Sequence, residues 1–136
     1  HEFAHGLAAV KWPGRFELLR KNPIFIADGA HNPHGIKGTA ESLARHFPGK
    51  KIIAVIGVMA DKDVDTMLDL FLPLVKQAYA VRPDNPRALA PEALQTPGDG
   101  VRAALASAAQ DDVICAVGSF YMYGDIADAV EASVPR

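Results

Sequence analysis

The sequence has one cysteine, Cys115, so no disulfide can form within the chain, and its His and Cys residues lack the spacing of a zinc site. Cys115 stands in the apolar run VICAVG, where we expect a small core residue. The apolar runs fall far short of the roughly 20 residues that span a bilayer. The formal net charge is −2, which gives no basic field for nucleic acid or an anionic membrane. We therefore expect no nucleic-acid or membrane partner, and a cytoplasmic setting.

Three familiar site motifs are also missing. There is no GxxxxGK[ST] loop to cradle nucleotide phosphates, and no GxGxxG fingerprint of the usual dinucleotide site. There is no GxSxG elbow that would present a nucleophilic serine. These absences leave the chain without a self-contained version of any of these sites.

The chain has 136 residues, of which 49% are apolar and 22% charged, enough for one domain with a real core. It begins HEFAHGLAAV, with neither an initiator methionine nor a signal-peptide pattern. We expect residues 1–10 to be a linker or helix remnant from a missing N-terminal domain, residues 11–136 to form the domain, and the protein to be a monomer.

Strand and helix patterns alternate along the chain. FELLR (16–20) and IFIAD (24–28) flank the turn signal KNP and predict a hairpin. Uniformly apolar runs predict buried parallel strands at 52–58, 78–82 and 113–118, and periodic patterns predict helices at about 33–47, 64–75, 101–109 and 121–134. The order predicts an α/β domain with a mostly parallel sheet and one antiparallel hairpin strand at or near an edge. The first helix is expected to bury Ile36, Ala40, Leu43, Ala44 and Phe47.

Four loops leave the carboxyl ends of the expected strands, where ligands bind in open α/β sheets. They are DGAHNPH, GVMADKD, RPDNPR and GSFYMYG, and they contain most of the clusters of glycine and polar residues. If the hairpin partners sum to 43, Arg15 lies opposite Asp28. A slip of one or two residues would still leave WPGR (12–15) beside the end of the strand that delivers Asp28, so a cation and a carboxylate flank one crevice. Arg15 could then hold a phosphate in a bidentate fork, and Asp28 could accept hydrogen bonds from ribose hydroxyls.

Each of these residues also has a purely structural interpretation. Asn32 and Pro33 can start a helix as N-cap and first helical residue, Gly29 can permit a bend, and Asp28 and His31 can belong to the turn. The other polar loop residues would be caps, turn residues or solvated side chains: Asp61, Lys62, Asp63, Asp84, Asn85, Arg87 and Ser119.

Taken in order, WPGR, DGAHNP, GVMADKD, PDNPRA and GSFYMYG resemble the C-terminal domain of folylpolyglutamate synthase, often bifunctional with dihydrofolate synthase, in the Mur ligase superfamily. The resemblance runs from Leu7 onward and implies a Rossmann-like, three-layer domain. It implies a ligase that uses ATP to form an acyl phosphate on a folate carboxylate, which glutamate then attacks. ATP and Mg²⁺ are implied, with the phosphate-binding loop, the metal ligands and most of the pterin site on the N-terminal ATPase domain of the same protein. Folate and L-glutamate are the implied substrates, and no metal ligand is assigned to this chain.

On the nucleotide side, the resemblance implies that Arg15 contacts the ATP phosphates, Asp28 the ribose, and that Asn32 lies near the nucleotide. Lys62 is expected to be catalytic, because a lysine that closes on the phosphates would stabilise their charge.

On the glutamate side, the resemblance implies that His31 and Ser119 contact the glutamate. His31 is also expected to be catalytic. Arg87 resembles the Mur ligase arginine that grips a carboxylate of the incoming amino acid. One departure is that only QTPGDG separates the two helical segments where the family usually has a further helix and strand, so we expect a smaller sheet. The isolated domain is expected to fold without catalysing.

Two alternatives stay open. The chain could belong to another Mur-type ligase, of the peptidoglycan or cyanophycin kind, because the pterin pocket does not lie on it. It could also be a stand-alone α/β binding module. A receiver domain would need an acidic cluster and a strand-end lysine in an order that this sequence does not have. A flavodoxin-like module would need a phosphate-binding loop that is richer in Ser, Thr and Gly than GAHNPHG.

Overall fold

The computed structural model describes residues 15–57, 64–82, 96–118 and 122–133. In chain order the elements are β1 (Glu17–Lys21), β2 (Ile24–Ala27), α2 (Pro33–His46), β3 (Ile52–Gly57), α3 (Val64–Phe71), the 3₁₀ turn η1 (Leu72–Leu74), β4 (Val75–Val81), α4 (Pro97–Ser107), β5 (Val113–Val117) and α5 (Tyr123–Ala132). No helix among these residues is long and apolar enough to cross a membrane.

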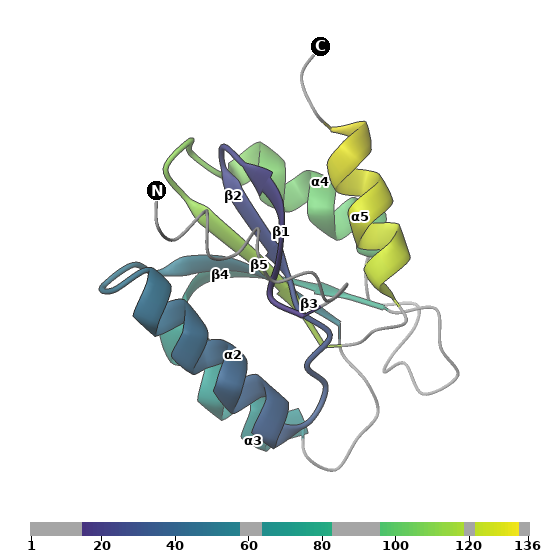
Figure 1. Cartoon of the computed structure of the whole chain (residues 1–136). Helices are drawn as coiled ribbons and strands as arrows, with labels where there is room; N and C mark the ends of the chain where they lie inside the picture. The colour runs from purple at the N-terminus through teal and green to yellow at the C-terminus, as the bar shows by residue number, and fades with distance from the viewer. Residues whose placement is uncertain (1–14, 58–63, 83–95, 119–121, 134–136) are drawn as a thin grey trace.

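The five strands form one sheet in the order β1-β2-β5-β3-β4. All neighbouring pairs are parallel except β1 with β2, which form an antiparallel hairpin at one edge. Helices α2 and α3 cover one face of the sheet and α4 and α5 the other (Figure 1). The expected three-layer α/β fold, with a mostly parallel sheet and one hairpin strand, is confirmed.

The core lies on both faces of the central strands. Phe25 and Ile53 pack in the cluster under α4 and α5, whereas Ile26 and Ile52 pack with Leu43 of α2 on the opposite face. Every residue of β5 is buried. The uniformly apolar sequences of β3 and β5 follow from this burial on both faces.

The expected boundary between α3 and β4 is wrong. The apolar periodicity predicted a helix to Val75, but α3 ends at Phe71 and a short 3₁₀ turn containing Pro73 leads directly into the strand. Proline cannot supply the backbone N–H of an α-helix interior, and the β-branched Val75 suits a strand. β4 is also less buried than expected, because Lys76–Ala78 and Ala80 are exposed on this edge strand.

Two helices differ from expectation in detail. In α2, Thr39 is buried and Ala44 is exposed, because Ile36, Thr39 and Leu43 form the row that faces the sheet. α4 starts at Pro97, four residues earlier than the expected 101, since Thr96 is an N-cap whose side chain accepts a hydrogen bond from the Asp99 N–H.

The hairpin register differs from the expected one by one to two residues, which is within the slip that the prediction allowed. Lys21 pairs with Ile24, so the turn holds only Asn22 and Pro23 and the offset beside it is two residues. The extra residue Leu19, at a β-bulge, reduces the offset to one where Glu17 pairs with Ala27. The shift leaves the segment that leads into β1 beside the carboxyl end of β2, and this proximity builds the cleft described next.

Candidate functional site: a cleft at the carboxyl end of β2

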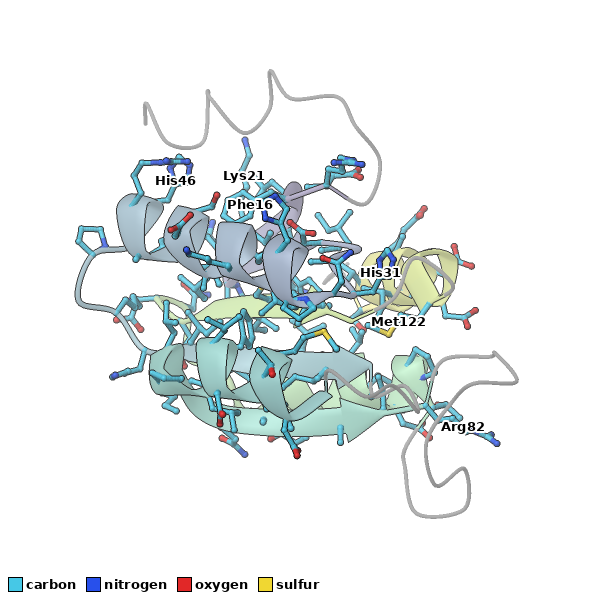
Figure 2. All side chains as sticks on the ribbon, turned by 90° about the horizontal axis from the view of Figure 1, so that it is seen from below. Phe16, Lys21, His31, His46, Arg82 and Met122 are labelled. Carbon is cyan, nitrogen blue, oxygen red and sulfur yellow. The ribbon has the colours of Figure 1, made fainter. Side chains whose placement is uncertain are left out.

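An open cleft of about 970 Å³ lies between the segment that leads into β1 and the first three turns of α2. Its lining includes Arg15, Asp28, His31, Asn32, Thr39 and Ser42. Figure 2 shows His31 at the end of α2 opposite His46, toward the same end of the sheet as Met122 and Arg82. The cleft therefore lies where the parallel strands end, the usual ligand-binding edge of an open α/β sheet.

Asp28 is a partly buried carboxylate in the lining of the cleft. Its backbone N–H donates to Ala116 O in β5 at 2.8 Å, which fixes the residue at the end of the sheet. The carboxylate accepts from the Ala30 N–H at 2.9 Å and also from the Phe16 N–H and the Thr39 side chain. The carboxylate is thus held by donors from three separate segments.

Burial raises the pKa of Asp28 above its ordinary value of 3.8. Its hydrogen bonds from Ala30, Thr39 and Phe16, and the charge of Arg15, oppose this increase without cancelling it. A partly desolvated carboxylate destabilises the folded state at neutral pH, and groups with pKa values shifted in this way cluster at functional sites.

The raised pKa predicts how Asp28 affects stability. The folded chain holds the Asp28 proton more tightly than the unfolded chain, so this stabilisation is fully present below pH 3.8 and is lost as the pH rises through the folded-state pKa. Asp28→Asn cannot ionise, so its melting temperature relative to wild type is expected to increase from about pH 4 to pH 7. Thermal unfolding of both chains across that range measures the difference, and a difference that does not change with pH would contradict the expectation.

Phe16 has an unusual backbone conformation. Its φ is +46°, which is rare for a bulky side chain, and it connects Arg15 to the first residue of β1. The conformation turns the Phe16 N–H toward the Asp28 carboxylate, while the ring lies 5.5 Å from that of His46. Strain of this kind is typical of functional segments whose surroundings hold the backbone in place.

Asn32 and His31 lie at the mouth of the cleft. Asn32 is the N-cap of α2, as the structural interpretation predicted, and its Oδ1 accepts from the Gly35 N–H at 2.8 Å. His31 is exposed, and its Nδ1 lies 3.0 Å from Gly29 O. Because a carbonyl oxygen only accepts, that contact places a proton on Nδ1. The N-terminus of α2 also adds a favourable potential for an anion at this mouth.

Gly118 connects the Asp28 loop to the central strands. Its N–H donates to Ala30 O at 2.9 Å, so the loop after β2 is tied to the end of β5. Its φ is +119°, and a Cβ at this position would lie 2.2 Å from Gly57 O at the end of β3. Three strand ends can therefore meet behind the cleft only if this residue is glycine.

The structure brings four of the sequence-predicted site residues to one cleft: Arg15, Asp28, His31 and Asn32. Lys62, Arg87 and Ser119 lie outside the described residues. Sequence reasoning missed Thr39, whose signal was its spacing of four residues from Gly35 and seven from Asn32 along one helix face. Within the described ranges, no three side chains of His, Cys, Asp or Glu lie together as a metal-binding group would require.

Fold and site together define an α/β domain with a cation and a carboxylate in a cleft at the carboxyl ends of its strands. Residues 14–120 match the family model described as Mur ligase, glutamate ligase domain. The chain belongs to this family.

Relatives with similar sequences carry consistent names. The chain is 30% identical over 137 residues to a dihydrofolate synthase/folylpolyglutamate synthase of Escherichia coli, a match that covers 93% of this chain and 32% of that protein. It is 40% identical over 89 residues to a protein of the same name from Mycobacterium tuberculosis, covering 65% and 18%. The chain thus spans a third or less of the length of these relatives.

Solved structures show the same relationship. The bifunctional folylpolyglutamate synthase/dihydrofolate synthase of Yersinia pestis, complexed with AMPPNP and a manganese ion, matches with a TM-score of 0.80 and 29% identity, over 93% of this chain and 33% of that one. E. coli FolC, in complex with DHPP and ADP, matches with a TM-score of 0.81 and 26% identity over the same shares.

Proposed function

We propose that this chain is the C-terminal domain, at residues 11–136, of an ATP-dependent folate–glutamate ligase: a folylpolyglutamate synthase, alone or combined with dihydrofolate synthase activity. The observation that carries the proposal is that Arg15, just before β1, and Asp28, just after β2, line one cleft at the carboxyl edge of the sheet. Family membership and the names of the relatives support it. Residues 1–10 would form the linker to an N-terminal ATPase domain.

The cleft suits a nucleotide. The guanidinium of Arg15 can hold phosphate oxygens through two parallel hydrogen bonds. The Asp28 carboxylate only accepts hydrogen bonds when ionised, and ribose hydroxyls can donate them. Asn32 already caps α2 through Oδ1, so we assign it to the mouth of the site beside the nucleotide.

The proposed reaction transfers the γ-phosphoryl group of ATP to a carboxylate of the folate, which gives an acyl phosphate and ADP. The amine of glutamate attacks the acyl carbon, loses a proton, and expels inorganic phosphate as the amide bond forms. We propose that His31 and Ser119 contact the glutamate side of the site, that Arg87 binds a carboxylate of the incoming glutamate, and that Lys62 stabilises the phosphates.

ATP would enter with Mg²⁺, which neutralises phosphate charge. Because the described residues bring no group of donors together, we propose that the metal ligands lie mainly on the N-terminal domain. We propose a cytoplasmic monomer in which the two domains close around ATP, so that the isolated chain is inactive.

The substrates can be tested with the full-length parent protein. Phosphate release with ATP and Mg²⁺ is expected to require both glutamate and a folate, tetrahydrofolate or dihydropteroate, and the product is expected to carry one added glutamate by mass spectrometry. Turnover with a different carboxylate–amine pair would overturn the folate assignment in favour of another Mur-type ligase. A folded protein that releases phosphate with no such pair would favour the binding-module alternative.

Arg15 gives a second test. Arg15→Lys in the full-length protein keeps the charge and removes the bidentate fork, so the KM for ATP is expected to increase about tenfold. Arg45→Lys, at an exposed position near the end of α2, is the matched control. Steady-state kinetics with varied ATP measure both, and equal KM values for the two variants would contradict the role of Arg15.

A further inference from the structure

Thr39 is one of two buried polar or charged side chains among the described residues, the other being Asp112. The burial of Asp112 has a structural explanation: its carboxylate pairs with Lys76 at 2.6 Å and accepts from the Ala109 N–H at 2.8 Å. Thr39 is 3% exposed, yet it lines the cleft beside Asp28. Its hydroxyl therefore needs an explanation of its own.

The Thr39 hydroxyl has two acceptors within reach. It donates to Gly35 O at 3.1 Å, one helical turn earlier, and it shares the cleft with the Asp28 carboxylate, whose pKa a hydrogen bond from the Thr39 side chain lowers. Both partners accept, and the hydroxyl has a single proton to donate. A hydrogen bond to an ionised carboxylate is about twice as strong as one to a neutral carbonyl, so the ionised Asp28 competes well for that proton.

We infer that Thr39 is a positioning residue, whose hydroxyl holds the Asp28 carboxylate in the orientation that accepts the ribose hydroxyls of ATP. This inference rests on the proposed function, in which Asp28 binds the ribose. A carboxylate has about four acceptor sites. Donors from Ala30, Phe16 and Thr39 occupy sites on its protein side, which leaves the remaining capacity for the cleft.

Of the three residues that donate to Asp28, only Thr39 donates through its side chain, so only its hydrogen bond can be removed by substitution. Ala30 and Phe16 donate through the backbone, which substitution does not remove. Among the residues that the structure describes, the other charged or titratable groups at the cleft or acting on Asp28 are Arg15 before β1, Cys115 on β5, whose thiol is fully buried, and the cleft residues His31 and His34.

A purely structural role is the alternative. Threonines within helices often bond the carbonyl four residues earlier, and that bond has no functional consequence. Valine has nearly the shape of threonine, so Thr39→Val removes the hydroxyl and keeps most of the packing. A structural threonine would then affect stability without changing which nucleotide the enzyme prefers.

The experiment compares ATP with 2′,3′-dideoxy-ATP in the full-length parent protein. Wild type is expected to prefer ATP by at least about tenfold in kcat/KM, because the dideoxy sugar cannot donate to Asp28. Thr39→Val is expected to lose most of that preference through a KM for ATP raised about five- to tenfold, with little change in kcat and little change for the dideoxy nucleotide. Thr39→Ser, which restores a hydroxyl, is expected to recover the preference.

Thr66→Val, at an exposed position of α3, is the matched control and is expected to behave as wild type. If Thr39→Val discriminates between the nucleotides as well as wild type does, the inference is wrong and Thr39 is structural. If wild type itself does not discriminate, the ribose assignment of Asp28 in the proposed function fails instead. Should Thr39→Val not fold, Thr39→Ala takes its place and is judged by the same ratio.

Discussion

Asp28→Asn in the full-length protein is expected to reduce kcat/KM for ATP about 100-fold, with the domain still folded. The substitution keeps the shape of the side chain but removes its charge and half of its acceptor capacity. Hydrogen bonds to a charged group are worth about 1.5–3 kcal/mol, and two ribose hydroxyls would be affected. The loss should appear mainly in KM for ATP, because the sugar is bound alike before and during phosphoryl transfer.

Asp69→Asn is the control for this experiment, because it makes the same chemical change at an exposed position of α3. It is expected to leave kcat/KM within about twofold of wild type. If Asp28→Asn retains wild-type kcat/KM while circular dichroism shows a folded protein, Asp28 does not bind the nucleotide.

Gly118→Ala is expected to destabilise the chain by about 3 kcal/mol or more. A methyl group at this position would lie 2.2 Å from Gly57 O, and the φ of +119° is one that side chains with a Cβ rarely adopt. Relief requires separation of the ends of β3 and β5, which would also displace Gly118, whose N–H donates to Ala30 O in the loop that carries Asp28. Weaker nucleotide binding should therefore accompany the lost stability.

Gly124→Ala is the matched control for that substitution. Gly124 is exposed in α5, and a Cβ there would meet nothing within 4 Å, so alanine should be neutral or stabilise by up to about 1 kcal/mol. Urea unfolding of the 136-residue chain gives the free energy of unfolding for both variants. Equal values would mean that the ends of β3 and β5 do not approach as closely as the structure shows.

The fold was predictable because its main signals are local. Uniformly apolar runs marked the central strands β3 and β5, and Asn32–Pro33 marked the start of α2. The register of the hairpin was not predictable, because the strands continue to Lys21 and Ile24 and leave only Asn22 and Pro23 for the turn. The bulge at Leu19 then shifts the pairing back by one residue. The start of α4 could have been predicted from the N-cap residue Thr96 and the proline that follows it. The expected start at residue 101 relied on the apolar periodicity instead.

The site was predictable where it depends on the ends of strands. It was not predictable where it depends on which face of a helix meets the sheet or on an unusual backbone conformation. Asp28 directly follows an apolar strand, so its place at the carboxyl edge followed from the topology rule. The role of Thr39 depends on which face of α2 meets the sheet, and the Phe16 N–H contact depends on a positive φ that its residue type argues against. The roles of Lys62, Arg87 and Ser119 remain predictions.

The central claim is that the cleft between the start of β1 and α2 binds the nucleotide. Hydrogen–deuterium exchange of the full-length parent protein, with and without saturating ADP, tests it directly. ADP is expected to slow exchange in residues 28–42, while α4, on the far face of the sheet, serves as the unchanged reference. Bound ADP that leaves exchange in residues 28–42 unchanged would contradict the account.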